Sequence, residues 1–176
     1  MAAYYYLLSS LPMLQPDGEM PITYEKFLQM CSESVKQPMY DLLRDLTVDS
    51  SRGKLLSKWS RFYNALSEEL AYQRCARLGR PVKAGENRDP DMIKTVNDVM
   101  NEKNPLNAEN MLLTLEMEKL DELLIDHWFD ESALIGYALK LRLLERRNVF
   151  DRESGKKEFG RILGSIRKKT DSMGLE

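Results

Sequence analysis

The chain has 176 residues and a net charge of −2, with 43% apolar and 31% charged residues, a composition typical of a folded globular protein. A chain of this length can bury a core without disulfides or metal ions. The pI near 5.6 argues against a general nucleic-acid binder, and two lone cysteines, Cys31 and Cys75, argue against a disulfide framework and favour a reducing, cytoplasmic setting. No apolar run is long enough to predict a transmembrane helix, and the apolar segment Met1–Leu11 lacks the basic residues of a signal peptide, so we expect it to pack into the core.

Turn and capping signals divide the first half of the chain into helices. The run Tyr4–Leu8 is compatible with an extended or a helical conformation. Thr23 is a predicted N-cap, and Pro38 suits the first turn of the following helix. A long helix is predicted from Arg52 to Leu78, ended by Gly79. Its apolar face turns polar after Leu70, which predicts that the far end projects from the core or meets a partner.

The second half of the chain contains four further predicted helices. Asp89-Pro90 opens the first of them and Asn104-Pro105 ends it, and Asn107 is the expected N-cap of the next. Asp130 should cap a helix with two apolar stripes, which therefore packs against neighbours on two sides. Ser154 opens a last helix, which should bury Phe159, Ile162, Leu163 and Ile166.

These elements predict an all-α fold, a bundle of about six or seven helices. We expect a single helical domain over residues 1–176. The alternative is a pair of lobes, 1–79 and 90–176, joined by a Gly-, Pro- and charge-rich linker at 80–89.

Charge is distributed very unevenly between residues 107 and 169. Residues 107–139 carry eight carboxylates against Lys119, whereas residues 140–169 carry eleven Lys and Arg against four carboxylates. Phasing predicts a solvated face for Glu118, Asp121, Glu122 and Asp126. The basic residues either complement the acidic helix within the chain or bind an acidic partner. The candidate partner-binding residues are Arg142, Arg146, Arg147, Lys156, Lys157 and Arg161.

Signatures of catalysis are missing from the sequence. His127 is the only histidine, which excludes a multi-histidine metal site, and it is expected to interact with local carbonyls at a helix end. No residues converge in a recognisable pattern for acid–base or nucleophilic chemistry. We therefore predict no catalytic residues, no cofactor, no metal ion and no small-molecule substrate.

Two segments resemble a known family. The opening Tyr4–Pro12, with the sequence YYYLLSSLP, resembles the start of an uncharacterised bacterial family encoded beside subunits of V-type ATPases. Residues 115–146, through His127-Trp128-Phe129-Asp130, resemble that family and, more weakly, the helical C subunit of the V-type ATPase (the d subunit in eukaryotes). In the V-type ATPase family this central-stalk component is an all-helical socket that joins the rotating stalk to the membrane rotor ring, and this chain is much shorter.

The resemblance implies a non-enzymatic helical subunit or assembly partner of a bacterial V-type ATPase, with a reduced counterpart of the central-stalk socket as one form of it. Such a protein would bind ATPase subunits in the cytoplasm and would reach the inner membrane only indirectly, through the ATPase. The alternative is a stand-alone helical adaptor that binds an acidic protein, or less favourably nucleic acid, through its basic C-terminal helices. An enzyme is the third and least favoured hypothesis.

Overall fold

The computed structural model describes residues 2–85, 88–148 and 158–165, and within them it is all-helical, with no strand. The prediction of an all-α bundle is confirmed. The run whose conformation was open between extended and helical is the helix α1. The seven numbered helices are α1 (Ala2–Ser10), α2 (Tyr24–Ser32), α3 (Gln37–Arg44), α4 (Lys54–Arg77), α5 (Pro90–Asn101), α6 (Pro105–Leu123) and α7 (Glu131–Asn148).

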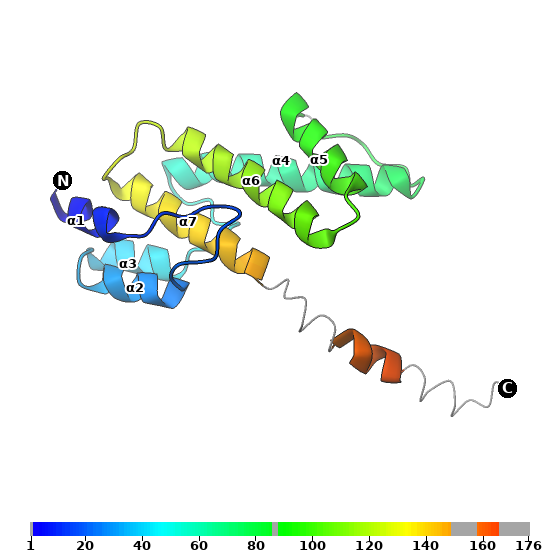
Figure 1. Ribbon diagram of the computed structural model, residues 1–176. Helices are drawn as coiled ribbons and strands as arrows, with labels where there is room; N and C mark the ends of the chain where they lie inside the picture. Colours follow the sequence, from blue (N-terminus) through cyan, green and yellow to red (C-terminus); the bar gives the residue numbers. More distant parts are fainter. Residues whose placement is uncertain (1, 86–87, 149–157, 166–176) are drawn as a thin grey trace.

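Helix α7 lies at the centre of the bundle. It contacts α1 and α2 on one side and α6 on another, and α6 in turn contacts α4 and α5 (Figure 1). Both predicted apolar stripes of α7 are used, since Leu134 and Leu141 of one stripe and Leu139 and Leu143 of the other are fully buried. The prediction that this helix packs on two sides is confirmed.

The larger hydrophobic core combines residues from both sides of the segment 80–89. Phe27 of α2 and Trp59 of α4 belong to the same cluster as Leu120 of α6 and Leu139 of α7. A smaller cluster forms where α5 meets α4, around Leu66, Met92 and Val96. The cores therefore do not follow a division into residues 1–79 and 90–176.

Most helix ends match their capping signals. Thr23 accepts a hydrogen bond from the backbone N–H of Lys26 at 3.2 Å, and Asp89 accepts one from that of Asp91 at 2.9 Å. The predicted N-cap Asn107 is wrong, because α6 begins one turn earlier. There the side chain of Asn104 accepts from the N–H of Leu106 at 3.1 Å, and the proline that follows Asn104 suits the first turn of a helix.

The polar far end of α4 was expected to project from the core or to meet a partner, and it is covered in part: Gln73 is buried, whereas Arg74 and Arg77 are exposed. Helix α5 packs on it, and Glu69 and Gln73 are buried beneath. Gln73 donates to Glu69 at 2.8 Å, and Arg88 from the segment before α5 donates to both Glu69 oxygens at 2.8 and 2.9 Å. These bonds satisfy most of the polar groups that burial would otherwise leave unpaired.

The predicted last helix is described only over residues 158–165, which are helical. Phe159, Ile162 and Leu163 are exposed, so the prediction that they lie inside is wrong, and Ile166 lies outside the described residues. No helix in the described part of the chain has both the length and the apolarity needed to cross a membrane.

Candidate functional site: an exposed aromatic groove

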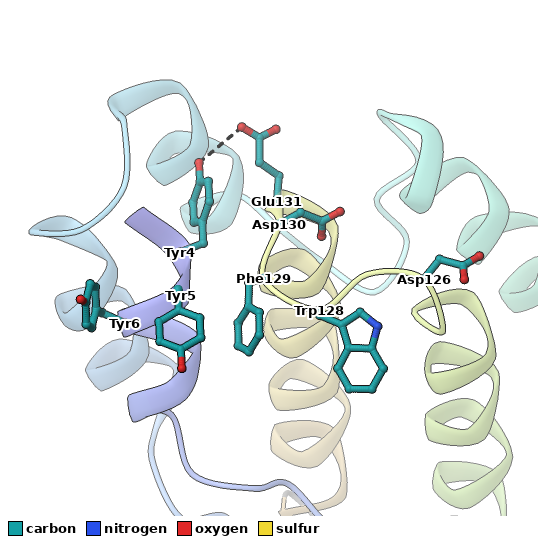
Figure 2. Close-up of a pocket in the computed structure, with 8 residues that line it drawn as sticks. All are labelled: Tyr4, Tyr5, Tyr6, Asp126, Trp128, Phe129, Asp130 and Glu131. Carbon is teal, nitrogen blue, oxygen red and sulfur yellow. Dashed lines mark hydrogen bonds between the residues drawn. The ribbon is translucent and has the colours of Figure 1, made fainter. Parts of the chain in front are cut away.

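An open groove of about 690 Å³ lies where α1 meets the turn between α6 and α7 (Figure 2). We call it the aromatic groove. It combines residues that are far apart in the sequence, from the first turns of the chain and from the turn that precedes α7. Its lining residues are Tyr4, Tyr5, Tyr6, Asp126, Trp128, Phe129, Asp130 and Glu131.

Helix α1 supplies three consecutive tyrosines to the groove. Leu7 is buried in the main core and Tyr4 packs at its edge, which fixes the face that α1 turns inward. Tyr5 and Tyr6 consequently remain 50% and 77% exposed. The expectation that the whole amino-terminal segment packs into the core is therefore wrong for these two side chains.

Two hydrogen bonds attach α1 and the segment after it to α7. The Tyr4 hydroxyl donates to Glu131 at 3.3 Å, and the Tyr137 hydroxyl donates to the carbonyl oxygen of Pro12 at 2.9 Å (Figure 2 shows the first). Burial, together with the nearby charge of Glu131, raises the pKa of Tyr4, so this phenol stays a donor at neutral pH. The groove wall on this side is thus held in place by contacts to the central helix.

The turn before α7 supplies the other aromatic side chains. The N–H of His127 donates to the carbonyl of Leu124 at 2.8 Å, which closes the end of α6, and Asp130 caps α7 by accepting from the N–H of Ala133 at 2.9 Å. His127 Nδ1 lies 2.5 Å from Asp130 Oδ2, so the imidazole ring interacts with a carboxylate, whereas carbonyl partners were expected. The turn is therefore fixed at both ends.

The fixed turn directs Trp128 and Phe129 outward, where they are 75% and 41% exposed. The ring centroids of Tyr5 and Phe129 are 4.6 Å apart, which joins the two walls of the groove. Figure 2 shows Tyr5, Phe129 and Trp128 in a row between α1 and the end of α6. Exposed side chains this large and this close together mark an interaction surface more often than an ordinary solvated surface.

The groove is acidic. Asp126, Asp130 and Glu131 line it, and no lysine or arginine is among the described residues of its lining. Burial acts to raise the pKa of Asp130, but the backbone N–H groups of α7 and His127 outweigh it and hold that pKa below its usual value. An apolar ligand that carries positive charge would satisfy both the aromatic faces and the carboxylates.

Four of the six predicted partner-binding residues lie in the described part of the chain, and they make contacts within the chain at separate places. Arg146 donates to Glu116 at 2.9 and 2.6 Å and to Glu109 at 2.7 Å, inside the interface between α6 and α7. Arg142 stacks 3.5 Å from the ring centre of Tyr24 and donates to the carbonyl of Leu46 at 3.1 Å. These contacts match the alternative in which basic residues complement the chain itself.

Of the four remaining basic candidates, Arg147 and Arg161 make contacts within the chain. Arg147 donates to the carbonyl oxygens of Pro16 and Gly18 and so holds the turn that follows α1. Arg161 is exposed and donates to Glu158 at 2.9 Å, three residues earlier on the same helix. Lys156 and Lys157 lie outside the described residues.

The carboxylates of α6 and of the turn after it also have two different roles. Glu118, Asp121, Glu122 and Asp126 are exposed, as a solvated face requires. Glu116 is only 2% exposed and serves as the main partner of Arg146. Glu116 was not among the carboxylates predicted to form the solvated face, and its burial was not predicted either.

The described residues offer little that resembles a catalytic centre. Within them, no group of three or more His, Cys, Asp and Glu side chains is placed to hold a metal ion. Burial raises the pKa of the Cys31 thiol to about 12, so it is not a nucleophile at neutral pH. The groove presents hydrogen-bond donors, acceptors and aromatic faces, which are suited to binding, and the expectation that the protein is not an enzyme stays a prediction.

The sequence contains a signal for this site that helical periodicity does not reveal, namely two runs of adjacent aromatic residues. Three adjacent tyrosines cannot all face inward on one helix, and the pair Trp128-Phe129 stands in a turn, where burial is least expected. Only the contact between α1 and α7 shows that the two aromatic segments meet.

Comparison with known proteins gives a family and no function. The model of a family described as "Protein of unknown function (DUF2764)" matches residues 82–170, just over half of the chain. No curated protein matches the chain, and no solved structure does. The matched region contains α5, α6, α7 and the turn that carries Trp128 and Phe129. The chain therefore belongs to the DUF2764 family of proteins of unknown function.

Proposed function

We propose that this protein is a non-enzymatic helical subunit or assembly partner of a bacterial V-type ATPase, and that it docks through the aromatic groove. One observation carries the proposal. The two segments that resemble the family encoded beside V-type ATPase subunits, residues 4–12 and 115–146, come together at this groove. Tyr4 and Glu131, which are 127 positions apart in the sequence, are hydrogen-bonded there.

The physical character of the groove supports a docking role. Tyr and Trp are enriched at the centres of protein interfaces, because each buries a large rigid surface and keeps a polar atom for hydrogen bonding. Tyr5, Tyr6, Trp128 and Phe129 offer four large aromatic side chains on an ordered frame. A protein of this kind would hold a joint or transmit force by shape and charge, without chemistry.

The adaptor hypothesis, in which basic C-terminal helices bind an acidic protein, has less support. Four of its six residues, Arg142, Arg146, Arg147 and Arg161, already make hydrogen bonds within the chain. Binding a partner through them would require these contacts to break, and in the case of Arg146 would leave a buried carboxylate without its counter-ion.

Affinity purification of the tagged full-length protein from its native cells at low salt tests the proposal. We expect V-type ATPase subunits to co-elute with the protein and to be lost with Trp128→Ala. Leu78→Ala is the matched control, because Leu78 is an exposed apolar residue outside the groove. If ATPase subunits never co-elute, the assignment to the ATPase is wrong. If they co-elute equally with Trp128→Ala, the groove is not the docking surface.

A further inference from the structure

We infer that the aromatic groove binds the amphipathic segment at residues 158–165 of a second copy of the chain, a segment that basic residues flank in the sequence. The inference rests on the proposed function in one respect, that the groove is a docking surface. It adds the chemistry of an occupant and implies that an ATPase partner would compete with self-association.

The segment has the form of a docking helix. Phe159, Ile162 and Leu163 lie at spacing i, i+3, i+4 on one face of it and are all exposed. Such a three-residue apolar face on a helix is the usual anchor set for binding in a groove. In the described part of the chain, this face and the aromatic groove are thus both uncovered apolar surfaces.

The groove is acidic, and the sequence that flanks the segment is basic, although residues 158–165 themselves hold only Arg161 and Glu158. The sequence from 156 to 169 contains six Lys and Arg residues against Glu158 alone, whereas the groove has three carboxylates and no basic residue among its described lining. Arg161 pairs with Glu158 in an exposed ion pair of a kind that contributes little stability, so it can exchange that partner for a groove carboxylate. Complementary charge of this kind also speeds association and fixes orientation.

The position of the segment favours a second copy over its own chain. The groove lies at the first residue of α7, Glu131, and the chain leaves α7 at its last, Asn148. The 18 residues of α7 span about 27 Å at 1.5 Å per residue. The ten steps from residue 148 to residue 158 cover roughly 33 Å when fully extended.

That reach leaves almost no slack for a path around the helices that pack on α7. A second copy has no such constraint. Two copies, each with one segment and one groove, could exchange segments in a closed pair.

Fluorescence of the full chain tests this directly, because its two tryptophans report on different places. Trp59 is fully buried in the core, whereas Trp128 lines the groove and is exposed. We expect acrylamide quenching of Trp128 to fall as protein concentration rises, in step with an increase in mass from one chain to two by sedimentation equilibrium. Higher salt should shift both transitions to higher protein concentration.

Variants on each side should give the same result. Phe159→Asp and Tyr5→Ala should each weaken self-association at least tenfold, about what removing one central anchor costs. Leu78→Asp, at an exposed apolar position outside the groove, should leave it unchanged. A synthetic peptide of residues 154–169 should protect Trp128 in the Phe159→Asp variant, whose groove is intact, and should fail to do so in Tyr5→Ala.

Three results would overturn the inference. The first is a chain that stays monomeric with Trp128 open to quencher at every concentration. The second is protection of Trp128 that does not depend on concentration, which would assign the groove to the segment of the same chain. The third is self-association that Phe159→Asp leaves intact. None of these depends on ATPase subunits, so co-purification and self-association can fail separately.

Discussion

The charge cluster between α6 and α7 gives the sharpest test of the packing. Arg146 makes two parallel hydrogen bonds to Glu116, at 2.9 and 2.6 Å, and a third to Glu109 at 2.7 Å. Replacing it in the variant Arg146→Met keeps most of the volume and removes the charge. The Glu116 carboxylate would then be buried with no counter-ion.

The expected loss of stability is large. Removing one partner of a buried ion pair costs about 3–5 kcal/mol, because the remaining charge is left in a poorly solvated site. That is a sizeable share of the roughly 5–15 kcal/mol by which a domain is stable. Arg146→Lys keeps the charge but loses the planar guanidinium group that donates two parallel hydrogen bonds to Glu116, and we expect it to cost about 1–2 kcal/mol. In the double variant Arg146→Met/Glu116→Gln no buried charge is left at residue 116, so much of the loss should be recovered.

The loss should also depend on pH, in a direction set by Glu116. Burial raises the pKa of this carboxyl even though Arg146 opposes it, and removing Arg146 raises that pKa further. A carboxyl whose pKa is higher in the folded chain stabilises the fold at a pH below its unfolded pKa of about 4.3. This stabilisation is lost as the pH rises through the folded-state pKa, because the buried group must then ionise. The cost of Arg146→Met is therefore greater at about pH 7 than at about pH 5.

Urea unfolding followed by circular dichroism at both pH values measures these costs. The expected order at neutral pH is wild type, Arg146→Lys, and then Arg146→Met as the least stable. A cost for Arg146→Met below about 1 kcal/mol, within the range of ordinary surface substitutions, would refute the burial of the cluster. An equal cost at both pH values would refute the role given to the Glu116 charge.

Three further substitutions test other contacts by denaturation. The hydrogen bond from Arg88 lowers the pKa of Glu69, so the stabilisation by this ion pair is present above the unfolded pKa of Glu69 and is lost as the pH falls. Glu69→Gln should therefore cost about 1–3 kcal/mol near neutral pH and little in acid. A Cβ at Gly136 would lie 2.3 Å from a methyl carbon of Leu124, so Gly136→Ala should cost about 1–3 kcal/mol, yet stabilise by roughly 0.5–1 kcal/mol in a Leu124→Ala background, where only helix propensity remains. Asn104→Ala should cost about 1 kcal/mol through loss of the α6 cap, whereas Asn107→Ala should be neutral; the reverse order would restore the predicted boundary.

Local signals in the sequence were sufficient for most of the helix boundaries, because caps and apolar spacing act within a few residues. Thr23, Asp89 and Asp130 cap where their side chains predicted. The error at Asn107 arose because Asn104-Pro105 was assigned to the end of the preceding helix, whereas Asn104 is the N-cap of α6. The proline after Asn104 suits that N-cap, since it has no N–H to leave unpaired in the first turn.

Tertiary contacts determined what the sequence could not show. Periodicity identifies the faces of a helix but not the element that covers each face, so it did not show that Glu69 and Glu116 are buried. The groove was missed for the same reason. Tyr5 and Trp128 line one surface only because Leu7 and the Tyr4 hydroxyl fix α1 against the core and the start of α7.

The α7 arginines form hydrogen bonds within the chain, so the charge that a partner would meet at the groove is negative and not positive. The net basic charge after residue 139 suggested a partner with acidic groups, but Arg142 and Arg146 direct their hydrogen bonds to Leu46, Glu109 and Glu116. The uncovered aromatic surface is bordered by carboxylates, so it attracts a cationic partner. Salt should therefore weaken docking at the groove through the acidic side chains of this protein. Substitutions of Arg142 and Arg146 should act on stability, and should reduce binding only by unfolding the helices that hold the groove.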